Sequence, residues 1–339
     1  MSGTVRAGAA PTLEQVAAVA GLSRATVSRV INGSPKVTAE AVAAVNAAVE
    51  QLGYVPNRAA RVLASRRTLS IALVIPEDTA RFFADPYFAS AVQGAATHLA
   101  GTEYTLTLLI TSELDPAKTR RYLRGGNVDG ALILSHHSDD RSYVQLGNEM
   151  PVVFGGRPVS DDAARAHYVD VDNEAVARLA VDHLRARGRR RIATIAGPQT
   201  MAAGVDRCSG WERATAEAGV ERGPVATGDF TPEGGAEAMR ALLDGGEPFD
   251  GLFAASSQMA HGALGALRER GVRVPEDVGV VGVDDDYFAR NATPPLTTVR
   301  PPTAELGARM AQLLIARIEG VEVPRVTLMP IELVERDSA

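Results

Sequence analysis

The chain has 339 residues and a formal net charge of −6, and this length predicts a small domain beside a larger one. Hydrophobic residues make up 45% and charged residues 22%, so the chain is able to bury a core. Cys208 is the only cysteine, which excludes an internal disulfide framework and fits a reducing compartment. Because no signal peptide and no apolar run of about 18 residues is visible, we expect a cytoplasmic protein.

The negative charge is unevenly distributed along the chain. Residues 1–67 contain eight basic and three acidic residues and carry +5, which leaves −11 for the remainder. A basic first segment on an acidic body is expected when one end of a protein meets phosphate groups and the other does not.

The first part of the chain predicts three helices after a disordered lead-in over residues 1–11. Thr12 followed by Gln15 forms a capping box, which opens a first helix that ends at Gly21. Ser23 and Thr38 are placed to cap a second and a third helix. The apolar faces of the three helices are Leu13, Val16, Ala17 and Ala20; Val27, Val30 and Ile31; and Val42, Val45, Val49 and Leu52.

The first two predicted helices are separated by residues 21–23, a short turn with glycine of the kind that a helix-turn-helix requires. In a DNA major groove the second helix presents Arg24 and Ala25, with Arg29 one turn later. Arginine bonds guanine bidentately and alanine contacts a thymine methyl group. Thr26, Ser28 and Asn32 suit contacts to phosphate. The alternative is a three-helix bundle that binds another protein.

From Leu69 onward, short β-branched runs alternate with helical segments. The predicted strands are 69–75, 104–110, 128–134, 151–154, 191–196, 251–254 and 278–283. This alternation predicts parallel, doubly wound sheets, and the length of the segment predicts two lobes. Ligands of such folds bind outside the carboxyl ends of the strands, which places a small-molecule site between the lobes.

The basic segment resembles the DNA-binding head and hinge of the lac-repressor (LacI-type) family. The matching stretches are residues 12–17, 20–23, 26–32 and 53–60. The resemblance implies a helix-turn-helix domain over residues 12–56 and a hinge helix over residues 57–68 that folds on operator DNA, where Leu63 wedges into the minor groove. It implies DNA contacts from Thr12, Arg24, Ala25, Thr26, Ser28, Arg29, Asn32, Asn57, Arg58, Ala60 and Leu63. A homodimer then reads a pseudo-palindromic operator in the nucleoid.

The resemblance continues more loosely over residues 69–339 and implies a periplasmic-binding-protein-like core that carries dimerisation. Its first lobe takes residues of about 69–168 and 301–328, and its second lobe takes about 169–300 and 329–336. The matching segments are 85–88, 207–211, 228–230, 282–285 and 295–300. They imply effector contacts from Asp85, Tyr87, Phe88, Arg157, Arg207, Phe230, Ser256 and Asp284. A fork-shaped donor, carboxylates and stacking faces suit a sugar-like effector with many hydroxyls.

Each of these effector residues has an ordinary structural alternative. Phe88 and Phe230 are the kind of residue that fills a core, Asp284 the kind that caps a helix, and Arg207 the kind that forms a surface ion pair. The sequence also departs from the family pattern, since Gly156, Ser256 and Ser257 stand where family members carry side chains that grip sugar hydroxyls. We therefore expect a more positive site, which opens the possibility of an acidic or phosphorylated effector.

Other signals predict no catalysis and no cofactor or metal. Asp170-Val171-Asp172 lacks the residues that follow a phosphatase motif, and the adjacent His136 and His137 point apart on a strand. Walker A, dinucleotide, zinc and serine-hydrolase patterns are missing. The sequence thus predicts an effector-controlled transcriptional regulator, most often a repressor, with no membrane segment. A solute-binding protein without a regulatory role is the main alternative, and an enzyme on the same scaffold is a third.

Overall fold

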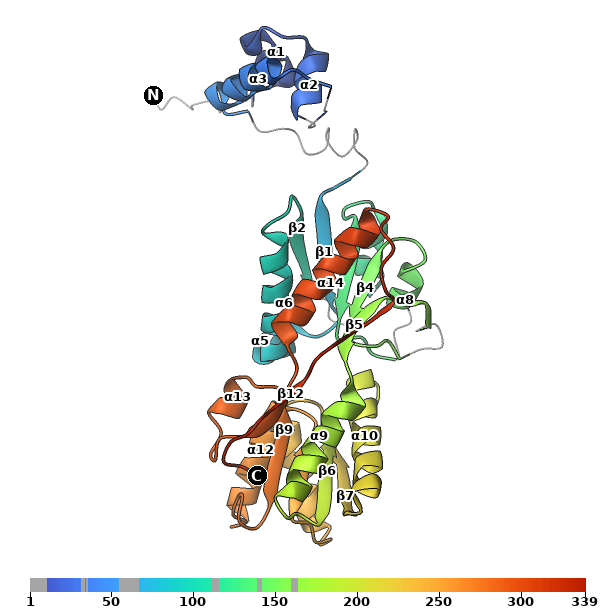
Figure 1. Ribbon diagram of the computed structural model, residues 1–339, viewed down its shortest axis with the longest axis vertical. Coiled ribbons are helices and arrows are strands. Elements are labelled where there is room, and N and C mark those ends of the chain that lie inside the picture. Colours follow the sequence, from blue (N-terminus) through green and yellow to red (C-terminus); the bar gives the residue numbers. More distant parts are fainter. Residues whose placement is uncertain are drawn as a thin grey trace, which may run out of the picture. The chain divides into compact units, whose positions relative to one another are not determined.

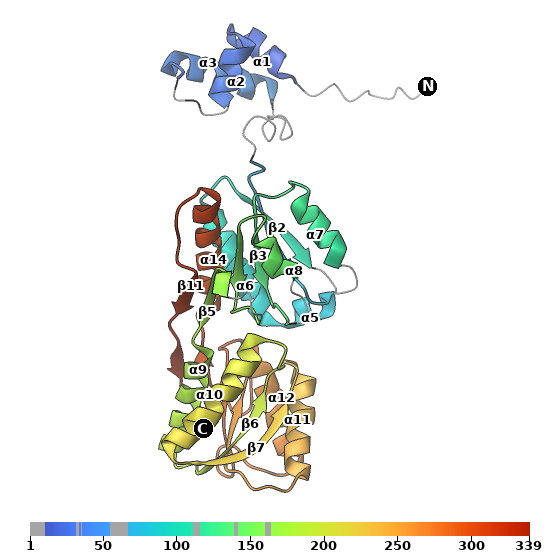
Figure 2. The ribbon, with the colours of Figure 1, turned by 90° about the vertical axis from the view of Figure 1, so that its right-hand side faces the viewer.

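The computed structural model describes residues 11–31, 34, 36–54, 67–110, 116–138, 142–159 and 164–339. By internal contacts the chain divides into two compact units, residues 1–68 and residues 69–339 (Figures 1 and 2). The predicted lead-in and most of the predicted hinge helix lie outside the described residues.

The first unit is a bundle of three helices, α1 (Leu13–Ala20), α2 (Arg24–Ile31) and α3 (Ala39–Leu52). The predicted capping box is confirmed, because the Thr12 side chain accepts from the Gln15 N–H and the Gln15 side chain accepts from the Thr12 N–H. Ser23 and Thr38 cap α2 and α3 as predicted. The buried core consists of Val16, Ala17, Val27, Val45 and Ala48.

The first lobe of the second unit is built on a six-stranded sheet in the order β11-β5-β4-β3-β1-β2, in which all neighbouring strands are parallel. The strands are β1 (Ser70–Ile75), β2 (Thr105–Ile110), β3 (Gly130–Leu134), β4 (Val152–Gly155), β5 (Tyr168–Val171) and β11 (Val326–Met329). One face is covered by α5 (Thr79–Ala84), α6 (Pro86–Leu99) and α14 (Thr303–Ile318), and the other by α7 (Pro116–Arg124) and α8 (Ser142–Leu146).

The second lobe repeats this plan with a sheet in the order β12-β10-β9-β8-β6-β7, in which β12 alone runs antiparallel. Its strands are β6 (Arg191–Ala196), β7 (Glu221–Thr227), β8 (Gly251–Ala254), β9 (Gly279–Val283), β10 (Thr297–Arg300) and β12 (Glu332–Val334). Helices α9 (Asn173–Ala186) and α10 (Ala202–Ala218) cover one face. Helices α11 (Pro232–Asp244) and α12 (Ser257–Glu269) cover the other, and α13 (Tyr287–Arg290) packs beside α12 (Figure 2).

The predicted α/β core with two doubly wound sheets is confirmed, and all seven predicted strands are present. The chain crosses between the lobes three times: between β5 and α9, between β10 and α14, and between β11 and β12. The first crossing follows Val171, because Tyr168–Val171 forms a strand of the first sheet. Strands β5, β7, β10, β11 and β12 were not predicted.

Helices α11 and α12 approach each other so closely that side chains are excluded from their contact. A Cβ atom at Gly262 would lie 1.8 Å from the carbonyl oxygen of Pro232, and one at Gly235 would lie 2.3 Å from the carbonyl oxygen of Met259. The contact matters for the effector site because both helices begin at its edge, where Phe230 and Ser256 lie.

We predict that Gly262→Ala lowers the free energy of unfolding by about 1–3 kcal/mol, because overpacking forces the helices apart. Gly265→Ala, in the same helix, is the matched control: a Cβ there meets nothing within 4 Å. This control should raise the free energy of unfolding by about 0.5–1 kcal/mol, since alanine favours a helix more than glycine does. Urea unfolding followed by circular dichroism measures both, and equal midpoints for the two variants would contradict the close approach.

Candidate functional site

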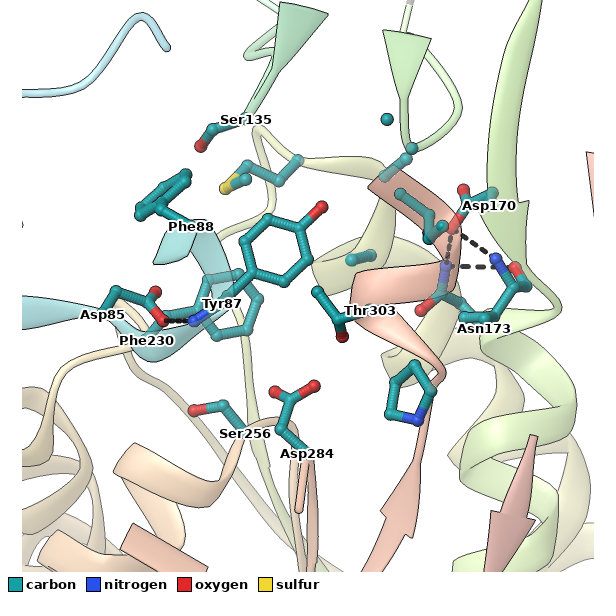
Figure 3. Close-up of a pocket in the computed structure, with 18 of the residues that line it drawn as sticks. Asp85, Tyr87, Phe88, Ser135, Asp170, Asn173, Phe230, Ser256, Asp284 and Thr303 are labelled. Carbon is teal, nitrogen blue, oxygen red and sulfur yellow. Dashed lines mark hydrogen bonds between the residues drawn. The ribbon is translucent and has the colours of Figure 1, made fainter. Parts of the chain in front are cut away.

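The eight predicted effector residues line one cavity between the two lobes of residues 69–339. The cavity has a volume of about 960 Å³, including its part open to solvent. Asp85, Tyr87, Phe88 and Arg157 come from the first lobe; Arg207, Phe230, Ser256 and Asp284 come from the second. Figure 3 shows Asp85, Tyr87 and Phe88 above Ser256 and Asp284. A cavity of this size with a few convergent polar groups is typical of a small-molecule site.

The backbone is held in an unusual conformation at the ends of three strands that face the cavity. In the described part of the chain four non-glycine residues have positive φ, and three of them line the cavity: Ser135 at +59°, Phe230 at +66° and Asp284 at +78°. They follow β3, β7 and β9. Such conformations cost on the order of 1–3 kcal/mol each and concentrate at ligand sites.

The aromatic side chains in the cavity are supported by the cores of their lobes. Phe88 is 2% exposed and stacks on Phe82 with ring centroids 5.8 Å apart, so it is a core residue as well as a cavity wall. The Phe230 ring lies against Gly197, where a Cβ atom would come within 2.3 Å of its Cζ atom. Figure 3 shows the Tyr87 ring in the middle of the cavity, with Phe230 behind it. These rings offer flat apolar faces to a ligand.

Arg207 is buried inside a hydrogen-bond network and is not a surface ion pair. Its Nε donates to Oδ1 of Asn173 at 2.9 Å and its Nη1 donates to the Ala255 carbonyl at 2.6 Å. Asn173 in turn donates through Nδ2 to Oδ1 of Asp170 at 3.1 Å, and Asp170 also accepts from the N–H of Arg157. The network therefore ties the end of β5 in the first lobe to α9 and α10 in the second.

The cavity holds equal numbers of acidic and basic side chains. Three carboxylates and three guanidinium groups line the cavity: Asp85, Asp170 and Asp284 with Arg81, Arg157 and Arg207. Arg157 also contributes little free charge, since its Nη2 donates to both oxygens of Asp206 on α10, at 2.6 and 2.9 Å. This ion pair joins the two lobes at one edge of the cavity.

Burial raises the pKa of two cavity carboxyls into the neutral range. The pKa of Asp284 rises to about 7 and that of Asp85 to about 6, in each case mainly because burial disfavours the charged form. The two groups come from opposite lobes; the charge of Asp85 adds to the rise in the pKa of Asp284, and the charge of Asp286 raises the pKa of both. Burial also raises the pKa of Tyr87 and of Asp170. Asp284 does not cap a helix; Asp286 caps α13 instead.

The head presents its predicted DNA-reading residues on the surface of α2. Arg24, Ala25 and Arg29 are exposed, while Thr26 and Ser28 are half-buried beside the core residue Val27. Nε of Arg24 lies 2.9 Å from Oε1 of Glu14, an exposed ion pair that costs little to break when a base replaces the carboxylate. Thr12 is exposed and caps α1. Asn32, Asn57, Arg58, Ala60 and Leu63 lie outside the described residues.

Within the described ranges, no group of three or more His, Cys, Asp or Glu side chains is arranged to hold a metal ion. The three consecutive aspartates 284–286 do not converge on one point. Asp284 lines the cavity, Asp286 caps α13, and Asp285 accepts from Arg290, Arg300 and Arg336. No helix among the described residues is long and apolar enough to cross a membrane.

Sequence reasoning missed several polar residues of the cavity: Ser135, Asp170, Asn173, Gln258 and Thr303. Asp170 and Asn173 flank the first crossing between the lobes, and recognising β5 as a strand of the first sheet would have identified both. Ser135 follows the predicted strand β3 directly, so the strand-end rule would have identified it.

A helix-turn-helix head joined to a bilobal core with a polar cavity defines a class of proteins: DNA-binding regulators that respond to a small molecule. Residues 12–57 match the bacterial regulatory proteins of the lacI family, and residues 181–339 match the periplasmic binding protein-like domain. The chain belongs to the LacI family of bacterial transcription regulators. It is an effector-controlled DNA-binding regulator and not an enzyme.

Similar proteins support this assignment over nearly the whole chain. The HTH-type transcriptional regulator CelR of Thermobifida fusca is 46% identical over 94% of this chain and 95% of its own length. A structure of the CelR–cellobiose complex matches with a TM-score of 0.77 at 44% identity, over 97% of this chain and 100% of that one. The lac repressor dimer bound to operator and the anti-inducer ONPF matches with a TM-score of 0.84 at 29% identity, over 97% and 99%.

We predict that Asp284→Asn stabilises the effector-free protein by roughly 1–3 kcal/mol at pH 8 and has a smaller effect at pH 5. A carboxyl whose folded-state pKa is raised contributes its full stability below its ordinary pKa of 3.8 and loses it as the pH rises to about 7. Asparagine resembles the protonated form and avoids this loss. Thermal unfolding between pH 5 and 8 measures the difference.

Asp277→Asn is the control of opposite sign. The exposed Asp277 has its pKa lowered to about 2 by hydrogen bonds from Arg273, so its stabilising effect is present throughout pH 5–8 and is lost only near pH 2. Its replacement should lower stability slightly and equally across that range. A stability gain for Asp284→Asn that does not change with pH would contradict the raised pKa.

Proposed function

We propose that the protein is a homodimeric repressor that binds a pseudo-palindromic operator and responds to a β-linked disaccharide such as cellobiose. The observation that carries the proposal is the convergence of all eight predicted effector residues on one cavity between the lobes. The relative CelR supports the ligand class, since its structure was determined as a cellobiose complex. The site of action is the nucleoid in the cytoplasm.

The chemistry of the cavity suits a sugar better than a strongly charged molecule. Tyr87 and Phe230 provide faces on which the C–H face of a pyranose ring stacks. Asp284, Asp85 and Ser256 supply hydrogen-bond acceptors for hydroxyl groups, and Arg207 supplies donors. Because acidic and basic side chains are equal in number, no single sign of charge dominates. These features disfavour the phosphorylated effector that the sequence had left open.

The exposed face of α2 supports operator reading. Arg24 and Arg29 extend from the surface of the helix that follows the turn, with the small Ala25 between them. A single head offers few base contacts, and a dimer doubles them with two-fold symmetry. The lac repressor, a structural relative, was solved as a dimer on its operator.

Effector control follows from a ligand that contacts both lobes at once. Such a ligand favours one arrangement of the lobes over another by its differential affinity, and a coupling of about 1–3 kcal/mol to DNA binding is typical. The hydrogen bonds of Arg157 to Asp206 and of Asn173 to Asp170 also cross between the lobes, so a ligand that disturbs them changes the lobe arrangement.

Arg24→Ala is expected to cost about 1–3 kcal/mol at its own base pair and to relax sequence preference there. Lys36→Ala removes the same charge from the same unit, outside the recognition helix, and should leave the order of preference among sequences unchanged. Selection of bound duplexes from a random pool, compared among the wild type and the two variants, measures this. An unchanged preference for Arg24→Ala would remove Arg24 from the base-reading residues.

The effector proposal is tested by titrating cellobiose against the protein bound to its selected operator. We expect operator affinity to change about 5- to 150-fold, the range that corresponds to 1–3 kcal/mol. Arg207→Gln should retain operator binding and lose the cellobiose response, because the donor network around the cavity is broken. Ser209→Ala, on the same helix, is the control and should respond as the wild type does.

Two failures of this experiment have different meanings. If the wild type binds no duplex in preference to random competitor, the regulatory function is wrong. If it binds an operator and cellobiose leaves the affinity unchanged, the DNA-reading function stands and the ligand class is wrong.

A further inference from the structure

A second, smaller cavity opens on the first lobe, away from the effector site. It has a volume of about 440 Å³ including its open side, and none of its lining residues lines the effector cavity. Its lining residues are Val144, Gly147, Asn148, Val152, Phe154, Arg165, Ala166, His167 and Arg317. They come from α8 and the loop after it, from β4, from the segment before β5 and from the last turn of α14.

The polar side chains at this cavity are cationic or neutral, and none is acidic. Arg165, His167 and Arg317 line it, and Arg325 lies close enough to influence the charge of His167. Within the described ranges, no carboxylate lies within 4 Å of a side-chain nitrogen of any of these four residues. Asn148 adds an exposed amide that is able to donate.

The hydrogen bonds that this cluster makes with other described residues go to backbone carbonyls, which carry no negative charge. Nη1 of Arg317 donates to the Val152 carbonyl at 2.5 Å, and Nη1 of Arg325 donates to the Ala164 carbonyl at 3.2 Å. Nδ1 of His167 lies 3.2 Å from the Pro324 carbonyl oxygen. These bonds fix the positions of the cationic groups around the cavity while supplying no negative charge.

Burial and the clustering of cationic side chains at this cavity lower the pKa of His167, and burial lowers the pKa of Arg317. Burial lowers the pKa of Arg317, which is half-buried. The pKa of His167 is lowered first by burial and then by the charges of Arg317 and Arg325. A bound anion would relieve both effects, because it would favour the charged forms of these groups.

We propose that this cavity binds the phosphate group of a small molecule. Guanidinium groups bind phosphate oxygens through paired N–H donors, and Arg165 and Arg317 approach the cavity from different elements, so that together they can clamp one anion. The cavity is less than half the volume of the effector cavity, which suits a phosphate group with the remainder of the molecule in solvent. The proposal is independent of the effector class.

The location of the phosphate site connects it to the effector cavity through one helix. Thr303 and Leu306 in the first turn of α14 line the effector cavity, and Arg317 near its end lines the phosphate site. A helix of this length spans about 24 Å. The two sites therefore occupy opposite ends of a single rigid element.

The test is a titration of the full-length protein with inorganic phosphate, followed by NMR of the histidine ring protons at constant ionic strength. We expect saturable shifts and a rise in the pKa of His167, whose signal is assigned from a His167→Gln variant. Arg165→Gln and Arg317→Met should each weaken phosphate binding about tenfold, which is about 1.4 kcal/mol for one lost charged contact. Arg317 is half-buried, and its replacement could prevent folding. Arg165 is exposed, so Arg165→Gln is expected to keep the fold and tests the proposal by itself.

The matched control is Arg309→Gln, which removes the same charge from α14 at a position outside the cavity and should bind phosphate as the wild type does. Equal losses for Arg165→Gln and Arg309→Gln, or equal shifts with sodium chloride, would overturn the proposal. A second titration uses glucose 6-phosphate in place of inorganic phosphate, and the two affinities are compared. Tighter binding than inorganic phosphate identifies an organic phosphate as the ligand, and equal or weaker binding identifies free phosphate.

Discussion

The polarity of parallel strands is the constraint on which the effector site depends. In each lobe the strand order of the first five strands is 2-1-3-4-5, and every parallel strand ends at the same edge of its sheet. The residues just beyond these ends, including Ser135, Phe230 and Asp284, meet across the space between the lobes. Residues that are spread over about two hundred positions of the sequence thereby line one cavity. The polarity of the strands, and not the local sequence around each residue, brings them together.

Direct bonds between the lobes add a second constraint. Besides the pair of Arg157 with Asp206, the Ser138 N–H donates to the Thr200 carbonyl at 2.9 Å and Nδ1 of His137 lies 3.2 Å from Oγ1 of Thr200. The His137 ring is itself oriented by Glu77, which lies 3.0 Å from its Nε2. These bonds lie beside the cavity rather than in it, so they set the lobe arrangement that a ligand must accept or change.

The sequence predicted the elements that carry a strong local pattern and missed those that do not. The seven predicted strands are central or apolar, whereas β7 is an edge strand that contains Gly223 and Pro224, and β12 has only three residues. The effector residues were predicted through the family resemblance. The pairing of Arg157 with Asp206, a partner 49 residues away in the sequence, could not be predicted, because only the folded lobes bring the two side chains together.

The carboxylates of the cavity give a physical reason why a ligand with hydroxyl groups controls the lobes. Asp85 of the first lobe raises the pKa of Asp284 of the second lobe, and Asp286 of the second lobe raises the pKa of both, so bringing the lobes together brings like charges together. The interlobe pair of Arg157 and Asp206 does not offset this repulsion, because its charges already neutralise each other. Ligand hydroxyl groups that donate to both carboxylates do offset the repulsion, because a hydrogen bond from a donor favours the ionised form of a carboxyl. One molecule makes both of these hydrogen bonds only when it contacts both lobes. The ligand thus stabilises one lobe arrangement through groups that disfavour it when the cavity is empty.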